Sequence, residues 1–198
     1  MHAPDEDVRL MLAFCEGDAA AFETLFRRWA GPLLRYLERM LGEAGAAEEL
    51  VQEAFLRVHR ARASYRPDAR FSSWLYRIGT NLALNELRRP ARRAPHGSVD
   101  SAEGDGEPLP AAPEPASDEL VDARREVRAL DRALRELPER QRAALWLVAV
   151  EGHSYAEVAR SLEISESAVK ALVHRARTSL AAQLATQGGA SGPRKETS

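Results

Sequence analysis

The sequence predicts an all-α protein: two small helical domains joined by a disordered acidic linker, with a helix-turn-helix in the second domain. Two observations lead to this prediction. Apolar residues recur at steps of three and four along most of the chain, which is the spacing of helices that bury one face. Between residues 90 and 117 this spacing stops, and Pro, Ala, Gly, Ser, Asp and Glu replace nearly all apolar side chains. We therefore expect domains at residues 1–89 and 118–185, and a disordered tail at 186–198.

The first domain should begin with a short apolar helix that ends at Gly17. Asp18 can cap the next helix, because its carboxylate can accept hydrogen bonds from the backbone of the first turn. Apolar residues at helical spacing carry this second helix to Leu41. Gly31 and Pro32 should kink it or divide it into two pieces, because proline removes a backbone donor inside a helix.

A further helix is expected over Ala46–Arg62, and its two faces differ. The core face carries apolar residues at helical spacing: Ala47, Leu50, Val51, Ala54, Phe55, Val58 and Ala61. The opposite face carries Glu49, Gln52, Glu53, Leu56 and Arg60. A leucine among carboxylates and an amide suits docking on a basic partner. It equally fits an ordinary solvated face with one stray leucine.

The last helix of the first domain is expected over Phe71–Arg89. Its core stripe consists of Phe71, Leu75, Ile78 and Leu82. A neighbouring face carries an aromatic ring, amides and guanidinium groups: Trp74, Arg77, Asn81 and Arg88, with Asn85 at its margin. Single-stranded nucleic acid needs these groups for base stacking, base edges and phosphates. A half-buried tryptophan beside solvated arginines would look the same. A Pro-Asp turn within residues 63–70 precedes this helix.

The second domain should contain four helices. The first has a stripe of Leu120, Ala123, Val127, Leu130, Leu134 and Leu137, and Pro138 ends it. An apolar helix over Arg142–Val150 follows. Ser154 and Glu157 form a capping box that starts the third helix at Tyr155. A tight turn and a cap at Ser165 then start the fourth helix, so the last two helices form a helix-turn-helix.

The fourth helix of this domain has the faces of a DNA-recognition helix. Apolar residues pack inward: Ala168, Val169, Leu172, Val173, Ala176 and Leu180. A mostly polar face points outward, with cations at its sides: Glu166, Ser167, Lys170, Ala171, His174, Arg175, Arg177 and Thr178. Polar side chains can read base edges, and flanking cations can bind phosphates. A helical hairpin in a protein-binding module is the alternative.

Charge is distributed unevenly along the chain, although 28 basic residues nearly balance 30 acidic ones. From Phe55 to Arg93 there are ten arginines against two acids, a net charge of +8. From Ala94 to Ala123 there are eight acids and no Lys or Arg, a net charge of −8. The basic block suits a polyanion, and the acidic block could mimic one or serve as a solvated spacer.

Several classes of protein are disfavoured. Cys15 is the only cysteine, so neither an intramolecular disulfide nor a cysteine-based zinc site can form. The acidic start is unlike a signal peptide and no apolar run approaches about 20 residues, so we expect a soluble cytoplasmic protein. The pairs His153–Glu157 and His59–Glu53 lack a third metal ligand, and no phosphate-binding glycine loop is present. We expect no enzyme activity, no metal and no cofactor.

Three segments together resemble a known family. AEELVQEAFLR (Ala47–Arg57) and FSSWLYRIGTNLALNELRR (Phe71–Arg89) resemble region 2 of bacterial RNA polymerase sigma factors, in the extracytoplasmic-function (ECF) group. LPERQRAALWLVAVEGHSYAEVARSLEISESAVKALVHRARTSL (Leu137–Leu180) resembles region 4 of the same factors. The order and separation of the segments make the resemblance far more specific than any one of them alone.

The resemblance implies three binding surfaces. Core polymerase would be bound through the clamp helices of its largest subunit, by Glu49, Leu50, Gln52, Glu53 and Leu56. The unpaired minus-ten strand would be held by Tyr65, Arg66, Asp68, Trp74, Arg77, Asn81, Asn85 and Arg88. The minus-thirty-five element would be read in the major groove by Glu166, Ser167, Lys170, Ala171, His174 and Arg175. Ala171 can offer only a methyl contact to thymine.

The resemblance also implies partners. The second domain would touch the flap of the second-largest polymerase subunit, the linker would lie in the polymerase cleft, and an anti-sigma factor would cover the docking surfaces. A different class of protein stays open on the residues alone. A one-component repressor or activator could use the same helix-turn-helix without polymerase, with residues 18–89 as a dimerisation or ligand domain.

Overall fold

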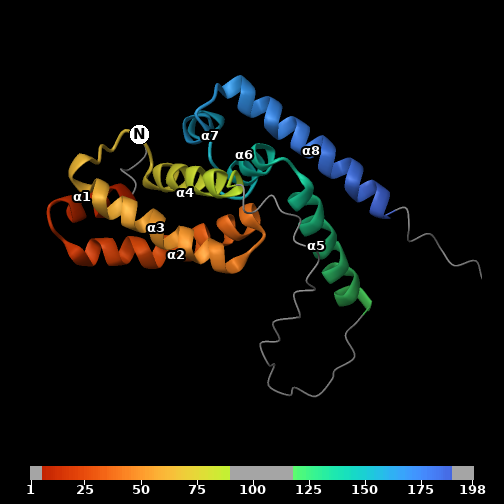
Figure 1. Cartoon of the computed structure of the whole chain (residues 1–198), viewed down its shortest axis with the longest axis horizontal. Helices are drawn as coiled ribbons and strands as arrows, with labels where there is room; N and C mark the ends of the chain where they lie inside the picture. The colour runs from red at the N-terminus through yellow and green to blue at the C-terminus, as the bar shows by residue number, and fades with distance from the viewer. Residues whose placement is uncertain (1–5, 90–117, 189–198) are drawn as a thin grey trace, which may run out of the picture.

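The computed structural model of the chain describes residues 6–89 and 118–188 (Figure 1). Within these two ranges the secondary structure is helical and contains no strand, which confirms the all-α prediction. The predicted linker at 90–117 and most of the predicted tail lie outside the described residues. No helix in the described ranges is long and apolar enough to cross a membrane.

Four α-helices and one short 3-10 helix make up the first domain. They are α1 (Glu6–Cys15), α2 (Ala19–Leu41), α3 (Ala44–Arg60), η1 (Ala61–Ser64) and α4 (Phe71–Leu87). α2 and α3 lie alongside each other, and α4 packs on both of them (Figure 1). The core contains large side chains without solvent exposure: Met11, Leu25, Leu33, Tyr36, Leu37, Val58, Phe71, Leu75 and Tyr76.

Helix α2 shows both a confirmed and a wrong prediction. Asp18 caps it, accepting hydrogen bonds from the backbone nitrogens of Ala20 and Ala21 at 2.9 and 3.2 Å. Of the two outcomes expected at Gly31-Pro32, a kink or a division, the division is wrong, because one helix runs through Pro32 to Leu41. Residues before and after the proline are buried in the same core. That packing outweighs the cost of roughly 3 kcal/mol for a proline inside a helix.

Helix α4 is buried on more sides than its predicted stripe. Besides the four predicted core residues, which are buried or half-buried, the structure buries Ser72, Ser73, Tyr76, Gly79, Thr80, Ala83 and Leu84. α4 packs tightly at Gly79, where a Cβ atom would lie 2.8 Å from Leu33 Cδ1. α4 therefore lies in the middle of the molecule, between α2 and α3 on one side and the second domain on the other.

The second domain consists of α5 (Asp118–Glu136), α6 (Glu139–Ala149), α7 (Tyr155–Leu162) and α8 (Glu166–Gly188). The predicted capping box is present at α7. Glu163 adopts a left-handed conformation with φ of 55° in the turn before α8. At the start of α8, Ser165 Oγ accepts a hydrogen bond from the Ala168 backbone nitrogen at 3.2 Å. The helix-turn-helix thus forms as its sequence predicts.

Two expectations for the second domain are wrong. Val127 and Leu130, expected in the core stripe of α5, are 58% and 41% exposed. Further along the helix, Leu134 is half-buried and Leu137 is buried. Of the four stripe residues from Val127 onward, only Leu134 and Leu137 are therefore packed against the core. In addition, α8 continues to Gly188, past the expected domain end at 185, and Gln183 on the same helix donates a hydrogen bond to Glu136 at 3.0 Å.

Candidate nucleic-acid interface

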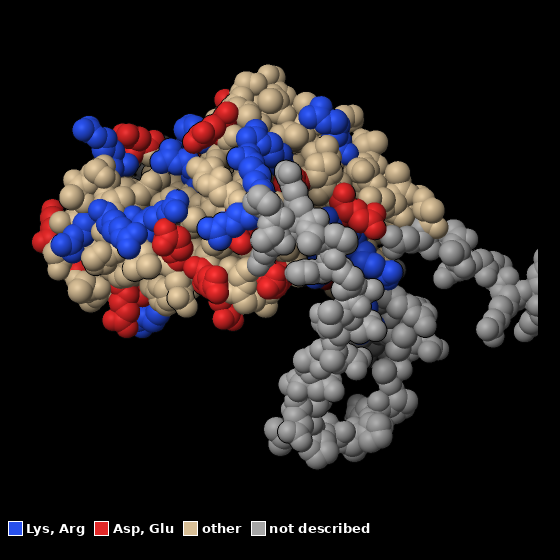
Figure 2. All heavy atoms as spheres, in the orientation of Figure 1, with Lys and Arg blue, Asp and Glu red and all other residues tan. Residues whose placement is uncertain are grey.

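The predicted single-strand face forms one continuous row along α4. Trp74 and Asn81 are half-buried, whereas Arg77, Asn85 and Arg88 are exposed. Their spacing of three, four, four and three residues keeps all five on the same side of the helix. Figure 2 shows Lys and Arg side chains on the visible face around this helix. The row thus combines an aromatic ring, two amides and two guanidinium groups, as the sequence predicts.

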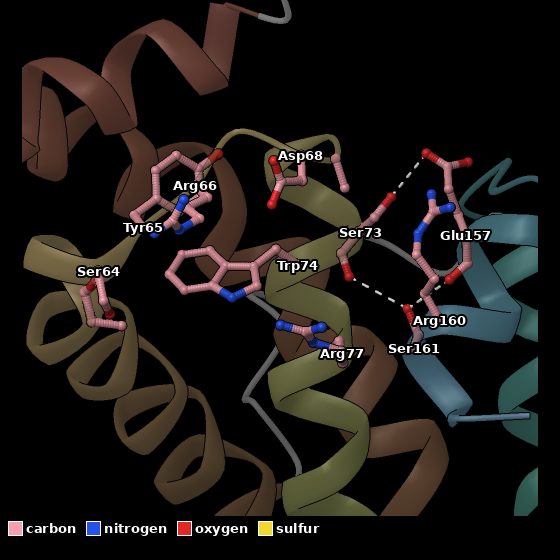
Figure 3. A pocket seen from close by; sticks show the side chains of 12 residues that line it. Ser64, Tyr65, Arg66, Asp68, Ser73, Trp74, Arg77, Glu157, Arg160 and Ser161 are labelled. Atoms are coloured by element: carbon pink, nitrogen blue, oxygen red, sulfur yellow. Dashed lines mark hydrogen bonds between the residues drawn. The ribbon is translucent and has the colours of Figure 1, made fainter.

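The loop before α4 brings a second aromatic ring to the start of this row. The Tyr65 and Trp74 ring centroids lie 5.0 Å apart with an interplanar angle of 55°. Trp74 also contacts the buried Phe71 ring edge to face at 6.0 Å. Figure 3 shows Tyr65 and Arg66 on the loop beside the Trp74 ring, with Asp68 above it and Arg77 below. Contacts on two sides therefore hold Trp74 in one orientation.

These residues surround a cavity of about 480 Å³ (Figure 3). Five of the eight predicted minus-ten residues line it: Tyr65, Arg66, Asp68, Trp74 and Arg77. Its other wall comes from the second domain, through Glu157, Arg160 and Ser161 of α7. Sequence reasoning did not find these three as site residues, because nothing in the local pattern of α7 indicates a neighbour more than 80 positions earlier in the chain.

The remaining three predicted residues of this face lie around a separate hollow. Asn81, Asn85 and Arg88 line a volume of about 360 Å³ together with Arg57 of α3 and Arg140 of α6. Both arginines add positive charge that the single-strand hypothesis did not include. The face therefore has two recesses, one with aromatic rings and one with amides and guanidinium groups.

The predicted docking face of α3 is largely exposed. Glu49, Gln52 and Leu56 are open to solvent, with Leu56 at 49% exposure. Glu53 Oε1 accepts a hydrogen bond from Arg57 Nε at 2.7 Å, and this bond holds the pKa of Glu53 below its usual range. Leu50 is half-buried, so it belongs to the rim of this face more than to its centre.

A hollow of about 420 Å³ lies between this face and α4. Glu49, Leu50 and Glu53 line it from α3, and Glu86 of α4 and Arg89 just after α4 line its other side. The last two residues form an ion pair with 3.1 Å between Arg89 Nη1 and Glu86 Oε2. The docking face predicted on α3 is thus continuous with a charged edge of α4.

The recognition face of α8 is accessible. Glu166, Ser167, Lys170, His174 and Arg175 are exposed, and Ala171 is half-buried between them. Lys170 Nζ lies 6.0 Å from the centroid of the Tyr155 ring, which places the ammonium group over the ring at the start of α7. The six predicted residues thus lie on one side of the first turns of α8. Among the described residues, no group of three or more His, Cys, Asp or Glu side chains could hold a metal ion.

Comparisons with known proteins match both domains of the chain. The model of "Sigma-70 region 2" matches residues 25–93, and that of "Sigma-70, region 4" matches residues 127–180. ECF RNA polymerase sigma factor SigM of Mycobacterium tuberculosis is 37% identical over 175 residues, covering 88% of this chain and 83% of that protein. RNA polymerase sigma-H factor of Pseudomonas aeruginosa is 32% identical over 186 residues, covering 91% of this chain and 94% of that protein.

Solved structures show the same fold. CnrH, in complex with the cytosolic domain of CnrY, superposes with a TM-score of 0.64 at 27% identity, covering 92% of this chain and 99% of that chain. The sigma factor RpoE of Bartonella quintana, in complex with the anti-sigma factor NepR, superposes with a TM-score of 0.61 at 23% identity, covering 82% and 96%. The chain therefore belongs to the ECF group of the sigma-70 family, which are transcription initiation factors.

Proposed function

We propose that this chain binds core RNA polymerase, directs it to specific promoters and opens the minus-ten element. The observation that carries the proposal is the cavity at the start of α4, where Tyr65, Trp74 and Arg77 meet. A repressor acting on duplex DNA alone would have no use for a recess lined by two aromatic rings. Membership of the sigma factor family also favours initiation over the repressor alternative.

The cavity has the chemistry needed to hold an unpaired base. The Tyr65 and Trp74 rings offer faces on which a base can stack, and Asp68 can accept a hydrogen bond from an exocyclic amino group. Arg66 and Arg77 can bind the flanking phosphates. Stacking contributes roughly 1–3 kcal/mol per base, and extruding a base costs a few kcal/mol. A few such contacts can therefore stabilise the open strand without ATP.

The second domain would position the complex upstream. Lys170 and Arg175 can contact phosphates or guanine, and His174 can donate or accept a hydrogen bond at a base edge. Ala171 would supply a methyl contact to thymine. Glu166 and Ser167, in the first turn of α8, are placed to meet the groove edge first. In this arrangement sequence is read by the second domain and melting is done by the first.

Polymerase would be engaged by both domains. The exposed face of α3, with Glu49, Gln52, Glu53 and Leu56, suits the clamp helices of the largest subunit, and the second domain suits the flap of the second-largest subunit. Leu56 would supply the apolar contact and the carboxylates the charge complementarity. Such a factor acts where polymerase transcribes, which places it in the cytoplasm.

We further propose regulation by an anti-sigma factor. CnrH, which resembles this chain over nearly its whole length, is held by the cytosolic domain of a second protein. A protein partner that covered the exposed α3 face would prevent access of core polymerase.

Run-off transcription tests the proposed function. Purified core polymerase would be supplied with a library of upstream sequences, with and without the chain. Transcripts that start behind a shared two-block motif only when the chain is present would support an initiation factor. Retention of duplex DNA by the chain alone, without any transcript, would contradict the proposal and favour the repressor.

A further inference from the structure

Three arginines from separate parts of the fold line the hollow of about 360 Å³ beside α4. Arg57 comes from the last turn of α3, Arg88 directly follows the last residue of α4, and Arg140 lies in the first turn of α6. Glu163, in the turn before α8, is the only acid among the described residues that line this hollow. Its lining is therefore mainly basic, and we call it the arginine recess.

Little in the described part of the chain neutralises these guanidinium groups. Within residues 6–89 and 118–188, neither Arg88 nor Arg140 forms an ion pair, and both side chains are exposed. Arg57 pairs with Glu53 through its Nε atom at 2.7 Å. Cations gathered around one recess repel one another, so a bound anion would lower their electrostatic energy. The arginine recess therefore favours an anionic ligand.

Two amides and two leucines line the rest of the arginine recess. Asn81 and Asn85 lie four residues apart on α4, so both amides are on the same side of that helix. Leu84 and Leu162 are buried and supply apolar surface. Small-molecule sites combine apolar walls with a few polar groups that fix orientation, in volumes of about 300–1,000 Å³. The arginine recess has this combination, at the lower end of that range of volumes.

We propose that the arginine recess binds a small molecule that carries a diphosphate group. A planar guanidinium group can bind two phosphate oxygens at once, and such charge-assisted hydrogen bonds are among the stronger ones in proteins. A single phosphate displaces only a few waters of about 30 Å³ each, so it would leave most of the recess empty. Two linked phosphates can reach arginines that come from different helices.

Inorganic pyrophosphate and a nucleoside diphosphate share this chemistry. In a nucleotide the base would have the Asn81 and Asn85 amides for its edge and the Leu84 side chain for its face. Arg57 and Arg140 belong to none of the three predicted binding sets, so they distinguish the ligand site from the single-strand row.

Occupation of the arginine recess would compete with single-stranded DNA. Asn81, Asn85 and Arg88 belong to the row proposed for the unpaired strand, so ligand and strand would use the same groups. This competition rests on the proposed function, whereas binding of the diphosphate does not. A soluble diphosphate would then reduce promoter opening without touching the upstream reading face of α8.

Arg140→Gln is the most direct variant for testing the site. The Arg140 side chain is exposed and has no hydrogen bond or ion pair with another described residue, so its replacement should leave the fold intact. Arg140→Lys keeps the charge but loses the planar group that binds two oxygens. The matched control is Arg132→Gln on α5, because Arg132 is exposed in the same domain and does not line the recess.

Isothermal titration calorimetry of the full chain would measure binding of sodium pyrophosphate at constant ionic strength. We expect one pyrophosphate per chain with a Kd on the order of 10–100 µM, because several charge-assisted hydrogen bonds act together. Arg140→Gln should weaken binding by about tenfold, Arg140→Lys by less, and Arg132→Gln by less than about twofold. No saturable heat with the parent, or equal losses in the two glutamine variants, would overturn the site.

Titrations with ADP and AMP would define the ligand. AMP, with one phosphate group, should bind about tenfold more weakly than ADP, and equal affinities would overturn the requirement for a diphosphate. ADP binding about fivefold more tightly than pyrophosphate would support a nucleotide, and Asn85→Ala should then remove that advantage. Pyrophosphate binding as tightly as ADP would support the inorganic ion as the source of the diphosphate.

Anisotropy of a fluorescein-labelled random-sequence single-stranded DNA pool would test the competition. Pyrophosphate at ten times its own Kd should raise the apparent Kd for DNA by about tenfold in the parent, at constant ionic strength. The same effect in Arg140→Gln should need about tenfold more pyrophosphate. A DNA affinity that saturating pyrophosphate leaves unchanged would overturn the competition.

Run-off transcription by the parent separates the two proposals. Transcripts from a chain that does not bind pyrophosphate would contradict only the arginine recess as a ligand site. Pyrophosphate binding by a chain that gives no transcripts would contradict only the proposed function.

Discussion

At the scale of single residues, the Trp74 ring is held by neighbouring rings and still faces a cavity. Phe71 and Tyr65 contact it from two sides, yet it remains only half-buried and lines the cavity. A ring fixed in this way loses little conformational freedom when a base stacks on it. Its position on a row with Arg77 and Asn81 could be predicted from helical spacing alone. Helical spacing says nothing of Tyr65, which the family resemblance grouped with Trp74 and which the path of the loop brings beside it.

Trp74→Ala should weaken binding of single-stranded DNA by about tenfold, because one stacking platform contributes roughly 1–3 kcal/mol. Trp74→Phe keeps an aromatic face and should lose much less. Fluorescence anisotropy would measure both affinities, and affinity for core polymerase should stay unchanged. Equal losses for the two variants would show that packing, rather than stacking, is what Trp74 provides.

His153 should make stability depend on pH. Burial lowers its pKa, and the nearby carboxylates of Glu157 and Glu151 offset this only in part, while Arg70 lowers it further. Below about pH 6.5 the unfolded chain takes up a proton that the native histidine resists, so the free energy of unfolding should fall as pH drops. Above that pH both states are neutral and the effect disappears.

Urea unfolding between pH 5 and pH 7.5 would measure this dependence. The window lies above the range in which Glu157, whose pKa is lowered, begins to take up protons. His153→Phe retains a ring against Tyr76 and should have a flatter pH profile across the window. A parent profile as flat as that of the variant would show that His153 does not resist protonation.

At the scale of helices, close packing between α4 and α2 depends on Gly79. A Cβ atom at this position would come within 2.8 Å of Leu33 Cδ1, which is itself fully buried. Gly79→Ala should therefore lower the free energy of unfolding by about 1–2 kcal/mol, since overpacking exceeds the gain of roughly 1 kcal/mol in helix propensity. Gly45→Ala is the matched control in α3, where nothing lies within 4 Å. It should leave stability unchanged or raise it, and chemical denaturation would distinguish the two outcomes.

The start of several helices could be predicted from local capping residues, whereas the burial of each helix face could not. Asp18, the capping box at Ser154 and the cap at Ser165 act within one turn, so the sequence predicted where those helices begin. Pro32 does not divide α2, because core packing on both sides of it outweighs the local cost of a proline inside a helix. Val127 is exposed although it continues an apolar stripe, since periodicity indicates a face but not whether another helix reaches it.

At the scale of the whole molecule, the contact between the two domains could not be predicted from the sequence pattern. Ser73 and Glu157 are 84 positions apart, and each has a local role that accounts for its presence: one in the first turn of α4, the other in a capping box. Neither residue therefore suggests a distant partner. The same holds for Arg142, a buried cation within an apolar helix whose partner is a carbonyl group in α2. Such contacts depend on the relative placement of two separately formed domains.

The two DNA-binding surfaces should be separable by mutation. Lys170, His174 and Arg175 are exposed on α8, whereas the cavity at Trp74 is lined from α4, the preceding loop and α7. Lys170→Ala should weaken binding of an upstream duplex, chosen from the run-off library, by about 1–3 kcal/mol if Lys170 reads a base, and should leave binding of single-stranded DNA unchanged. Anisotropy titrations with both probes at one salt concentration would measure this. A comparable loss with single-stranded DNA would show that Lys170 binds phosphate and does not read a base.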